Sequence, residues 1–193
     1  MPSAQQSDER ARDQQEDAAG HDLRTGAATM PRIQRFTIFA VLVVVLIALD
    51  RVTKACAESA LSLGNPGIDL GPLALTLVHN RGAAFGMGEG AGLVFAGFAV
   101  AVVVAICCWL WFYKEHSLLE VIAVSLVAAG GIGNMIDRLT TGYVVDFFRF
   151  TFVDFPVFNV ADTCVTCGVV LFLIWLVFGS TLFGTDDEES GQS

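Results

Sequence analysis

The chain has 193 residues, of which 54% are hydrophobic, and its mean hydropathy is +0.61. Its apolar residues form long uninterrupted blocks without an amphipathic period, which favours a membrane protein over a soluble domain. The formal net charge of -9 comes largely from acidic residues near the two ends of the chain. Nucleic acid is therefore not an expected partner.

The two ends of the chain lack the apolar residues that a folded core needs. Residues 1–31 are rich in Gln, Ser, Ala, Asp and Arg, so we expect a disordered tail there. Residues 184–193 are mostly acidic and small, and we expect a second, acidic tail. This leaves residues 32–183 as the folded domain.

Within that domain, four apolar blocks are long enough to cross a bilayer. We place the spans at about 33–57, 91–113, 118–139 and 157–183. The purest part of the first block, Ile38 to Leu49, has the length of a signal-peptide core. However, no small-residue cleavage site follows it, so we interpret it as a retained helix. Four spans place both termini on one side of the membrane.

Two segments between the spans alternate with a period of two. Leu73, Leu75 and Leu77 alternate with other residues in one segment, and Phe148, Phe150 and Phe152 do so in the other. This pattern is typical of short strands, which we expect to form a small sheet on the bilayer surface. The predicted fold class is an all-α membrane protein with four transmembrane helices and a small sheet and loop region.

Polar residues of the spans gather near one membrane face. In the third span they follow Leu118 by about 24 to 30 Å of helix rise, and these residues are Asn134, Asp137 and Arg138. Asn159 and Asp162 lie in the first two turns of the returning fourth span. The first span brings Asp50 toward the same face, and the loop with Asn80 and Gly82 must lie there by topology.

Helical spacing indicates which of these groups share a helix face. Asn134 lies at i,i+3 and i,i+4 from Asp137 and Arg138, and Asn159 lies at i,i+3 from Asp162. Asp50 and Lys54 are also at i,i+4, which an interfacial salt bridge explains. For Arg138, capping of helix carbonyls or snorkelling to the surface is the structural interpretation.

Asp146 and Asp162 are the candidate catalytic pair. Their neighbours are apolar, so desolvation favours protonation, and two close carboxyl groups can share one proton. That arrangement is the one used by aspartic proteases. The residues themselves leave two alternatives open, which are separate structural roles and an ion or proton pathway.

Other chemistries have weaker support. Cys164-x-x-Cys167 has the spacing of a metal or redox site, but no second Cys or His pair lies near it, so packing is the simpler interpretation. The three histidines are scattered over a tail and loops, and Ser125 has no nearby His. We therefore expect no metal, no cofactor and no serine nucleophile.

Five motifs occur in order along the four spans. They run from Asp50-Arg-Val-Thr-Lys54 and Asn80-Arg-Gly-Ala-Ala-Phe-Gly86 through Gly130-Gly-Ile-Gly-Asn-Met-Ile-Asp-Arg138 and Val144-Val-Asp-Phe147 to Phe158-Asn-Val-Ala-Asp162. This set resembles the motifs of a known family, the lipoprotein signal peptidases or signal peptidase II. The resemblance covers about residues 32–179 and is specific, because five motifs match in order.

The resemblance implies an aspartic endopeptidase of the bacterial inner membrane. It implies removal of signal peptides from prolipoproteins, by cleavage on the N-terminal side of a diacylglyceryl-modified cysteine. The implied catalytic residues are Asp146 and Asp162. The implied substrate-binding and supporting residues are Asn80, Asn134, Arg138, Asn159, Asp50, Lys54, Asp137, Gly82 and Gly133.

Orientation also depends on the resemblance. Basic residues occur on both sides of the predicted spans, so the positive-inside count does not decide the topology. The resemblance implies cytoplasmic termini and a site near the outer face. The expected partners are prolipoprotein substrates and membrane lipid, and the expected state is a monomer.

Overall fold

The computed structural model describes residues 30–65, 67–82, 90–113 and 116–183. Its elements, in chain order, are α2 (Arg32–Ala60), β1 (Ile68–Asp69), β2 (Leu73–Asn80), α3 (Gly92–Phe112), α4 (Leu118–Thr140), β3 (Val144–Phe150) and α5 (Val160–Phe183). The segments predicted as tails lie outside the described residues, apart from residues 30 and 31, and so does Gly86.

The predicted fold class is confirmed. Four helices are long and apolar enough to cross a membrane, namely α2, α3, α4 and residues Val160–Phe178 of α5. The strands form one antiparallel sheet in the order β1-β2-β3. Helix α5 begins three residues later than the expected span, because Phe158 still pairs with Phe148 of β3.

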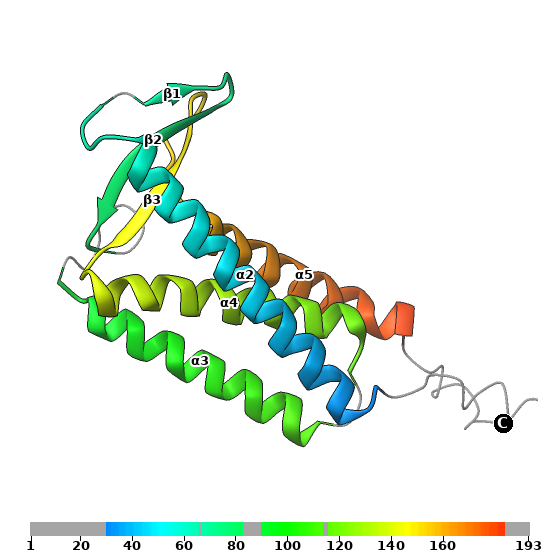
Figure 1. The fold of residues 1–193 in the computed structure, drawn as a ribbon. Coiled ribbons are helices and arrows are strands. Elements are labelled where there is room, and N and C mark those ends of the chain that lie inside the picture. The colour runs from blue at the N-terminus through cyan, green and yellow to red at the C-terminus, as the bar shows by residue number, and fades with distance from the viewer. Residues whose placement is uncertain (1–29, 66, 83–89, 114–115, 184–193) are drawn as a thin grey trace, which may run out of the picture.

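Helix α4 occupies the centre of the bundle and packs against α2, α3 and α5 (Figure 1). In its most apolar stretch, 56% of the residues are buried within the protein, against 17% in each of the other three helices. Its start is fixed by a capping box: Ser117 Oγ accepts from the Glu120 amide, and the Glu120 carboxylate accepts from the Ser117 amide. The polar residues Glu120, Ser125, Asn134 and Asp137 of α4 are all buried within the protein.

Small residues allow α4 and α5 to pack closely. A Cβ atom on Gly130 would lie 2.2 Å from the carbonyl oxygen of Ala161 and 2.7 Å from the Val165 side chain. Glycine is therefore required where the two helices cross, as is common between membrane helices. This crossing sets the distance between the last two turns of α4 and the first turn of α5.

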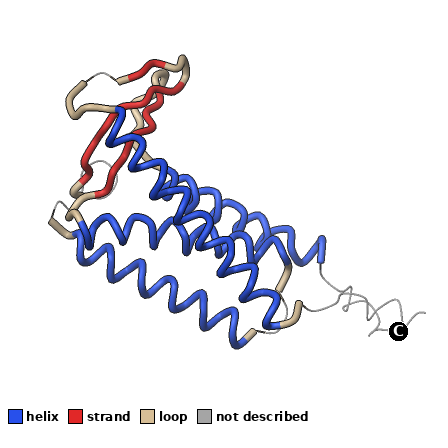
Figure 2. The backbone as a smooth tube through the Cα atoms, viewed as in Figure 1, coloured by secondary structure: helices blue, strands red, loops and turns tan. Residues whose placement is uncertain are grey.

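The sheet lies at the end of the bundle where α4 ends and α5 begins (Figures 1 and 2). Strand β2 pairs with β3, and a register irregularity falls between Leu75 and Val78. The predicted period of two is therefore interrupted: Ala74 and Leu77 are the buried residues of β2, three positions apart. Phe152, expected in the second strand, lies beyond its end and is exposed.

A backbone bridge joins the sheet to the last helix. Phe148 and Phe158 each donate an amide hydrogen bond to the other's carbonyl, at 2.8 and 2.9 Å. Because Phe148 is in β3 and Phe158 is two residues before α5, this bridge fixes the strand against the helix start. Asp146 and Asp162 are brought together by this link.

Gly130→Ala should destabilise the protein by about 1 to 3 kcal/mol, because the added methyl group forces α4 and α5 apart. Gly131→Ala is the matched control. Its Cβ would lie 3.7 Å from the nearest atom, on Ala99, which is an ordinary contact. Tryptophan fluorescence during unfolding in detergent measures both variants, and equal stability of the two would contradict this account of the crossing.

Candidate active site

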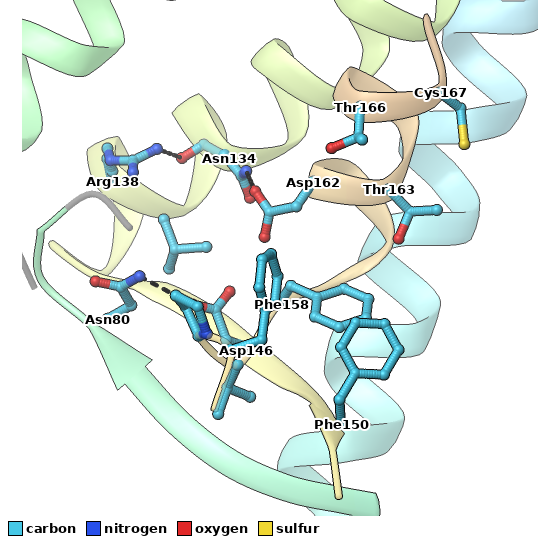
Figure 3. Close-up of a pocket in the computed structure, with 14 residues that line it drawn as sticks. Asn80, Asn134, Arg138, Asp146, Phe150, Phe158, Asp162, Thr163, Thr166 and Cys167 are labelled. Atoms are coloured by element: carbon cyan, nitrogen blue, oxygen red, sulfur yellow. Dashed lines mark hydrogen bonds between the residues drawn. The ribbon is translucent and has the colours of Figure 1, made fainter. Parts of the chain in front are cut away.

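Asp146 and Asp162 line the same pocket. Asp146 lies in β3 and is 2% exposed, and Asp162 lies in the first turn of α5. The pocket has a volume of about 400 Å³, and its other walls come from β2, α4, β3 and the segment before α5. Figure 3 shows the two carboxyl groups on the pocket side of their elements.

Asn159 connects the two aspartates. Its Oδ1 accepts from the amide of Asp162 at 2.9 Å, and Asp162 Oδ2 accepts from the amide of Asn159 at 3.1 Å. This reciprocal pair is a capping arrangement that starts α5. Because Oδ1 is engaged, Nδ2 faces the other way and donates to Asp146 Oδ1 at 2.6 Å.

Asn80 approaches Asp146 from the neighbouring strand. Its Oδ1 accepts from the amide of Gly82 at 3.0 Å, which closes a local turn. Its Nδ2 donates to Asp146 Oδ2 at 3.0 Å (Figure 3). Both carboxyl oxygens of Asp146 therefore accept hydrogen bonds from asparagine amides.

Asn134 donates a hydrogen bond to Asp162 in the same way. Its Oδ1 accepts from Lys54 Nζ at 3.0 Å and from Asn159 Nδ2 at 3.2 Å. Its Nδ2 donates to Asp162 Oδ1 at 2.7 Å. In all three asparagines the carbonyl oxygen is held by N–H donors, so the amide nitrogen is the group that faces an aspartate.

Lys54 is the cation at the centre of a buried ionic network. Its side chain is 0% exposed, and Nζ lies 2.9 Å from Asp50 Oδ2, 2.7 Å from Asp137 Oδ2 and 3.0 Å from Asn134 Oδ1. Two carboxylates and one amide oxygen therefore surround the ammonium group within 3.0 Å. Arg51, which is partly exposed, adds a second ion pair to Asp137.

The two acids of this network also hold the backbone that carries the site. Asp50 Oδ1 accepts from the amide of Ala161 in α5 at 3.0 Å, and Gly133 leaves room for the Asp50 carboxylate beside α4. Asp137 Oδ2 accepts from the amide of Val145 in β3 at 3.4 Å. The network therefore positions the residues directly before Asp162 and Asp146.

Arg138 lies at the edge of the pocket. Its Nη1 donates to the carbonyl of Asn134 at 3.4 Å and its Nη2 to the carbonyl of Gly82 at 3.2 Å. The guanidinium carbon is 5.2 Å from the centre of the Phe95 ring. Carbonyl capping, the structural interpretation from the sequence, describes these contacts, and they join the asparagine loop to α4.

The surroundings shift the protonation of Asp146, which lies outside the membrane-spanning helices. Burial, and after it the negative charge of Asp162, raise the pKa of Asp146 to about 7. Hydrogen bonds from Asn80 and Asn159 and the charge of Lys54 act in the opposite direction without cancelling the effect. Near neutral pH, Asp146 therefore carries a proton for a large part of the time.

The structure brings together every site residue that the sequence predicts, and it adds others. The ion pair of Arg51 with Asp137 is one that the sequence does not predict, although Arg51 stands next to Asp50 in the first motif. One wall of the pocket is formed by Phe150, Phe155 and Phe158, and another by residues of α5 that follow Asp162. The α5 residues of that wall include Cys167, which is a free thiol, as is the buried Cys164.

Among the described residues no three His, Cys, Asp or Glu side chains lie close enough together to act as metal ligands.

The fold and the site together define a polytopic membrane protein with two carboxyl groups in one pocket at the end of its helix bundle. A family model for signal peptidase II matches residues 42–178. The chain belongs to this family, whose members are proteases that act on lipoprotein precursors.

Curated relatives and solved structures agree with this assignment. Lipoprotein signal peptidase of Lactiplantibacillus plantarum is 43% identical over 138 residues, which is 71% of this chain and 92% of the relative. The enzyme of the same name from Streptococcus pneumoniae is 37% identical over 147 residues, 74% of this chain and 94% of the relative. A solved structure described as a bacterial membrane enzyme superposes with a TM-score of 0.69 at 30% identity, covering 80% of this chain and 94% of that one.

Lys54→Met should destabilise the protein by about 3 to 5 kcal/mol, because it leaves the buried carboxylates of Asp50 and Asp137 without their shared cation. Arg51→Met is the matched control, since Arg51 is a partly exposed cation that also pairs with Asp137. We expect it to cost less than about 1 kcal/mol. Unfolding in detergent measures both variants, and a larger loss in Arg51→Met would overturn the central place given to Lys54.

Proposed function

We propose that the chain is an aspartic endopeptidase that removes signal peptides from prolipoproteins, with Asp146 and Asp162 as its catalytic pair. The observation that carries the proposal is the convergence of three asparagine amides on two carboxyl groups that share one pocket. Such convergence fixes the positions of both acids without adding a cation between them. Membership of the signal peptidase II family supports the same reaction class.

The chemistry divides between the two acids. Asp162 acts as the carboxylate that removes a proton from a water molecule, and the oxygen of that water attacks the carbonyl carbon of the scissile peptide. Asp146 acts in its protonated form, donating a hydrogen bond to the carbonyl oxygen as negative charge develops there. When the carbon–nitrogen bond breaks, the proton taken from water passes to the leaving amine.

Two features support Asp146 as the acid. Its pKa of about 7 keeps it partly protonated at neutral pH. Asp162 accepts a hydrogen bond from the backbone amide of Asn159 and another from Asn134, whose oxygen is bound by the Lys54 ammonium. A donor polarised by a neighbouring cation stabilises the ionised form of its acceptor.

The position of the pocket suits a lipid-anchored substrate. Asp162 lies in the first turn of a membrane-spanning helix, so the peptide is cut near the bilayer surface while attached acyl chains remain in hydrocarbon. We propose cleavage on the N-terminal side of a diacylglyceryl-modified cysteine. Arg138 and Gly82 position the substrate backbone at the pocket edge.

The proposed setting is the bacterial inner membrane, with both termini in the cytoplasm and the pocket near the outer face. The described chain ends agree with a common side for the termini, since α2 begins and α5 ends at the same end of the bundle (Figure 1). The proposed state is a monomer, because one chain supplies both carboxyl groups and the three asparagines that bind them.

Asp146→Asn and Asp162→Asn should each reduce the cleavage rate of a diacylated precursor by about a thousand-fold or more, because an amide neither takes nor gives the required proton. Asp154→Asn is the matched control: it makes the same chemical change at an exposed position between β3 and α5. In vitro turnover in detergent or vesicles measures all three. Near-normal turnover by either Asp146→Asn or Asp162→Asn would show that the two aspartates are not the catalytic pair.

The cleavage rate should fall as pH rises above about 7, since the acid form of Asp146 is lost as pH passes its pKa. We expect a roughly ten-fold loss of kcat per pH unit beyond that point. Rates should be measured between pH 5 and 9 with a precursor that has no titrating group near the cleavage site. A rate that stays constant or rises from pH 7 to 9 contradicts the assignment of Asp146 as the acid.

A further inference from the structure

The pocket continues beyond the two aspartates along one face of α5. Asp162, Thr163, Thr166 and Cys167 occupy positions i, i+1, i+4 and i+5, so they share that face, and all four line the pocket. Figure 3 shows these side chains on the same helix, across from the rings of Phe150 and Phe158. The pocket thus has a polar wall on one side and an aromatic wall on the other.

The hydroxyl of Thr166 differs from those of other helical threonines. Threonines in membrane helices usually bond to the carbonyl four residues earlier, and four threonines do so here at 2.7 to 3.0 Å: Thr37, Thr53, Thr140 and Thr163. Within the part of the chain that the structure describes, the Thr166 hydroxyl has no hydrogen bond, and its side chain is exposed to the pocket. Because it is exposed and unpaired, this hydroxyl is available to donate a hydrogen bond to a molecule in the pocket.

The depth of Thr166 fits one particular group on the proposed substrate. One helical turn separates it from Asp162, which places it about 6 Å further into the bilayer. In a diacylglyceryl cysteine, the nearer ester carbonyl is about eight covalent bonds from the scissile nitrogen, a reach of roughly 8 to 10 Å for bonds of about 1.5 Å. An ester carbonyl accepts a hydrogen bond and has none to give, so it complements a hydroxyl donor.

We propose that Thr166 Oγ1 donates a hydrogen bond to an ester carbonyl of the substrate's diacylglyceryl group, so that α5 recognises the glyceryl ester as well as cutting the peptide. This inference rests on the proposed function, because it requires a diacylated precursor in the pocket. The glyceryl carbons lie between the Thr166 hydroxyl and the aromatic wall of Phe150, Phe155 and Phe158. Cys167 borders the same space with a small polarizable thiol.

Two precursor peptides test the proposal, one with ester-linked acyl chains and one with ether-linked chains of the same length. The ether removes the carbonyl acceptor and preserves the apolar bulk. The unaltered enzyme should cleave the diester with a kcat/KM about three to ten times that of the diether, mostly through KM, which is the effect of one net hydrogen bond. Thr166→Val, which keeps the side-chain shape and removes the donor, should cleave both peptides with the lower value.

Control variants separate this role from a general loss of packing. Thr166→Ser keeps the hydroxyl and should retain the preference for the diester. Thr37→Val makes the same chemical change in α2, where the hydroxyl is bonded to the carbonyl of Ile33, and should also retain the preference. Thr166→Val with an unchanged preference, or an unaltered enzyme without one, overturns the inference. Failure of the unaltered enzyme to cleave either peptide refutes the proposed function instead.

Discussion

A single buried ammonium group holds this site together. Lys54 lies among oxygens of α2 and α4, and each of those oxygens belongs to a residue that holds something else: Asp50 binds the start of α5, Asp137 binds β3, and Asn134 binds Asp162. A buried carboxylate without such a partner is strongly unfavourable. The cation therefore makes it possible for several acids to gather at the end of one helix bundle.

The asparagines support the two carboxyl groups with neutral donors, which favour the ionised form less strongly than a cation in contact would. An arginine or lysine in contact with Asp146 would favour its ionised form, whereas an amide donor satisfies an oxygen in either state. N–H donors bind the side-chain oxygens of Asn80, Asn134 and Asn159. Their NH₂ groups are therefore already oriented toward the aspartates. Neutral donors thus hold both carboxyl groups in fixed positions in the same pocket.

Much of this arrangement follows from the sequence. Apolar block lengths predict the four helices, and helix rise places Asn134, Asn159 and Asp162 at one membrane face. The contacts from Asp50 to the Ala161 amide and from Lys54 to Asn134 join residues 111 and 80 positions apart, and local pattern holds no information about them. The alternation of β2 misleads because an irregular register between Leu75 and Val78 changes which residues are buried. The free hydroxyl of Thr166 is likewise visible only once side chains are placed.

The hydrogen bond from the Ala161 amide to Asp50 joins the first membrane helix to the last one. During synthesis α2 is made long before α5, and Asp162 is added only with α5. A chain with three inserted helices already contains Lys54, Asn134 and Asp146, but the second carboxyl group and the Asn159 cap are still missing. The complete pair of acids therefore exists only in a fully inserted protein, so completion of the last helix is also the step that assembles the site.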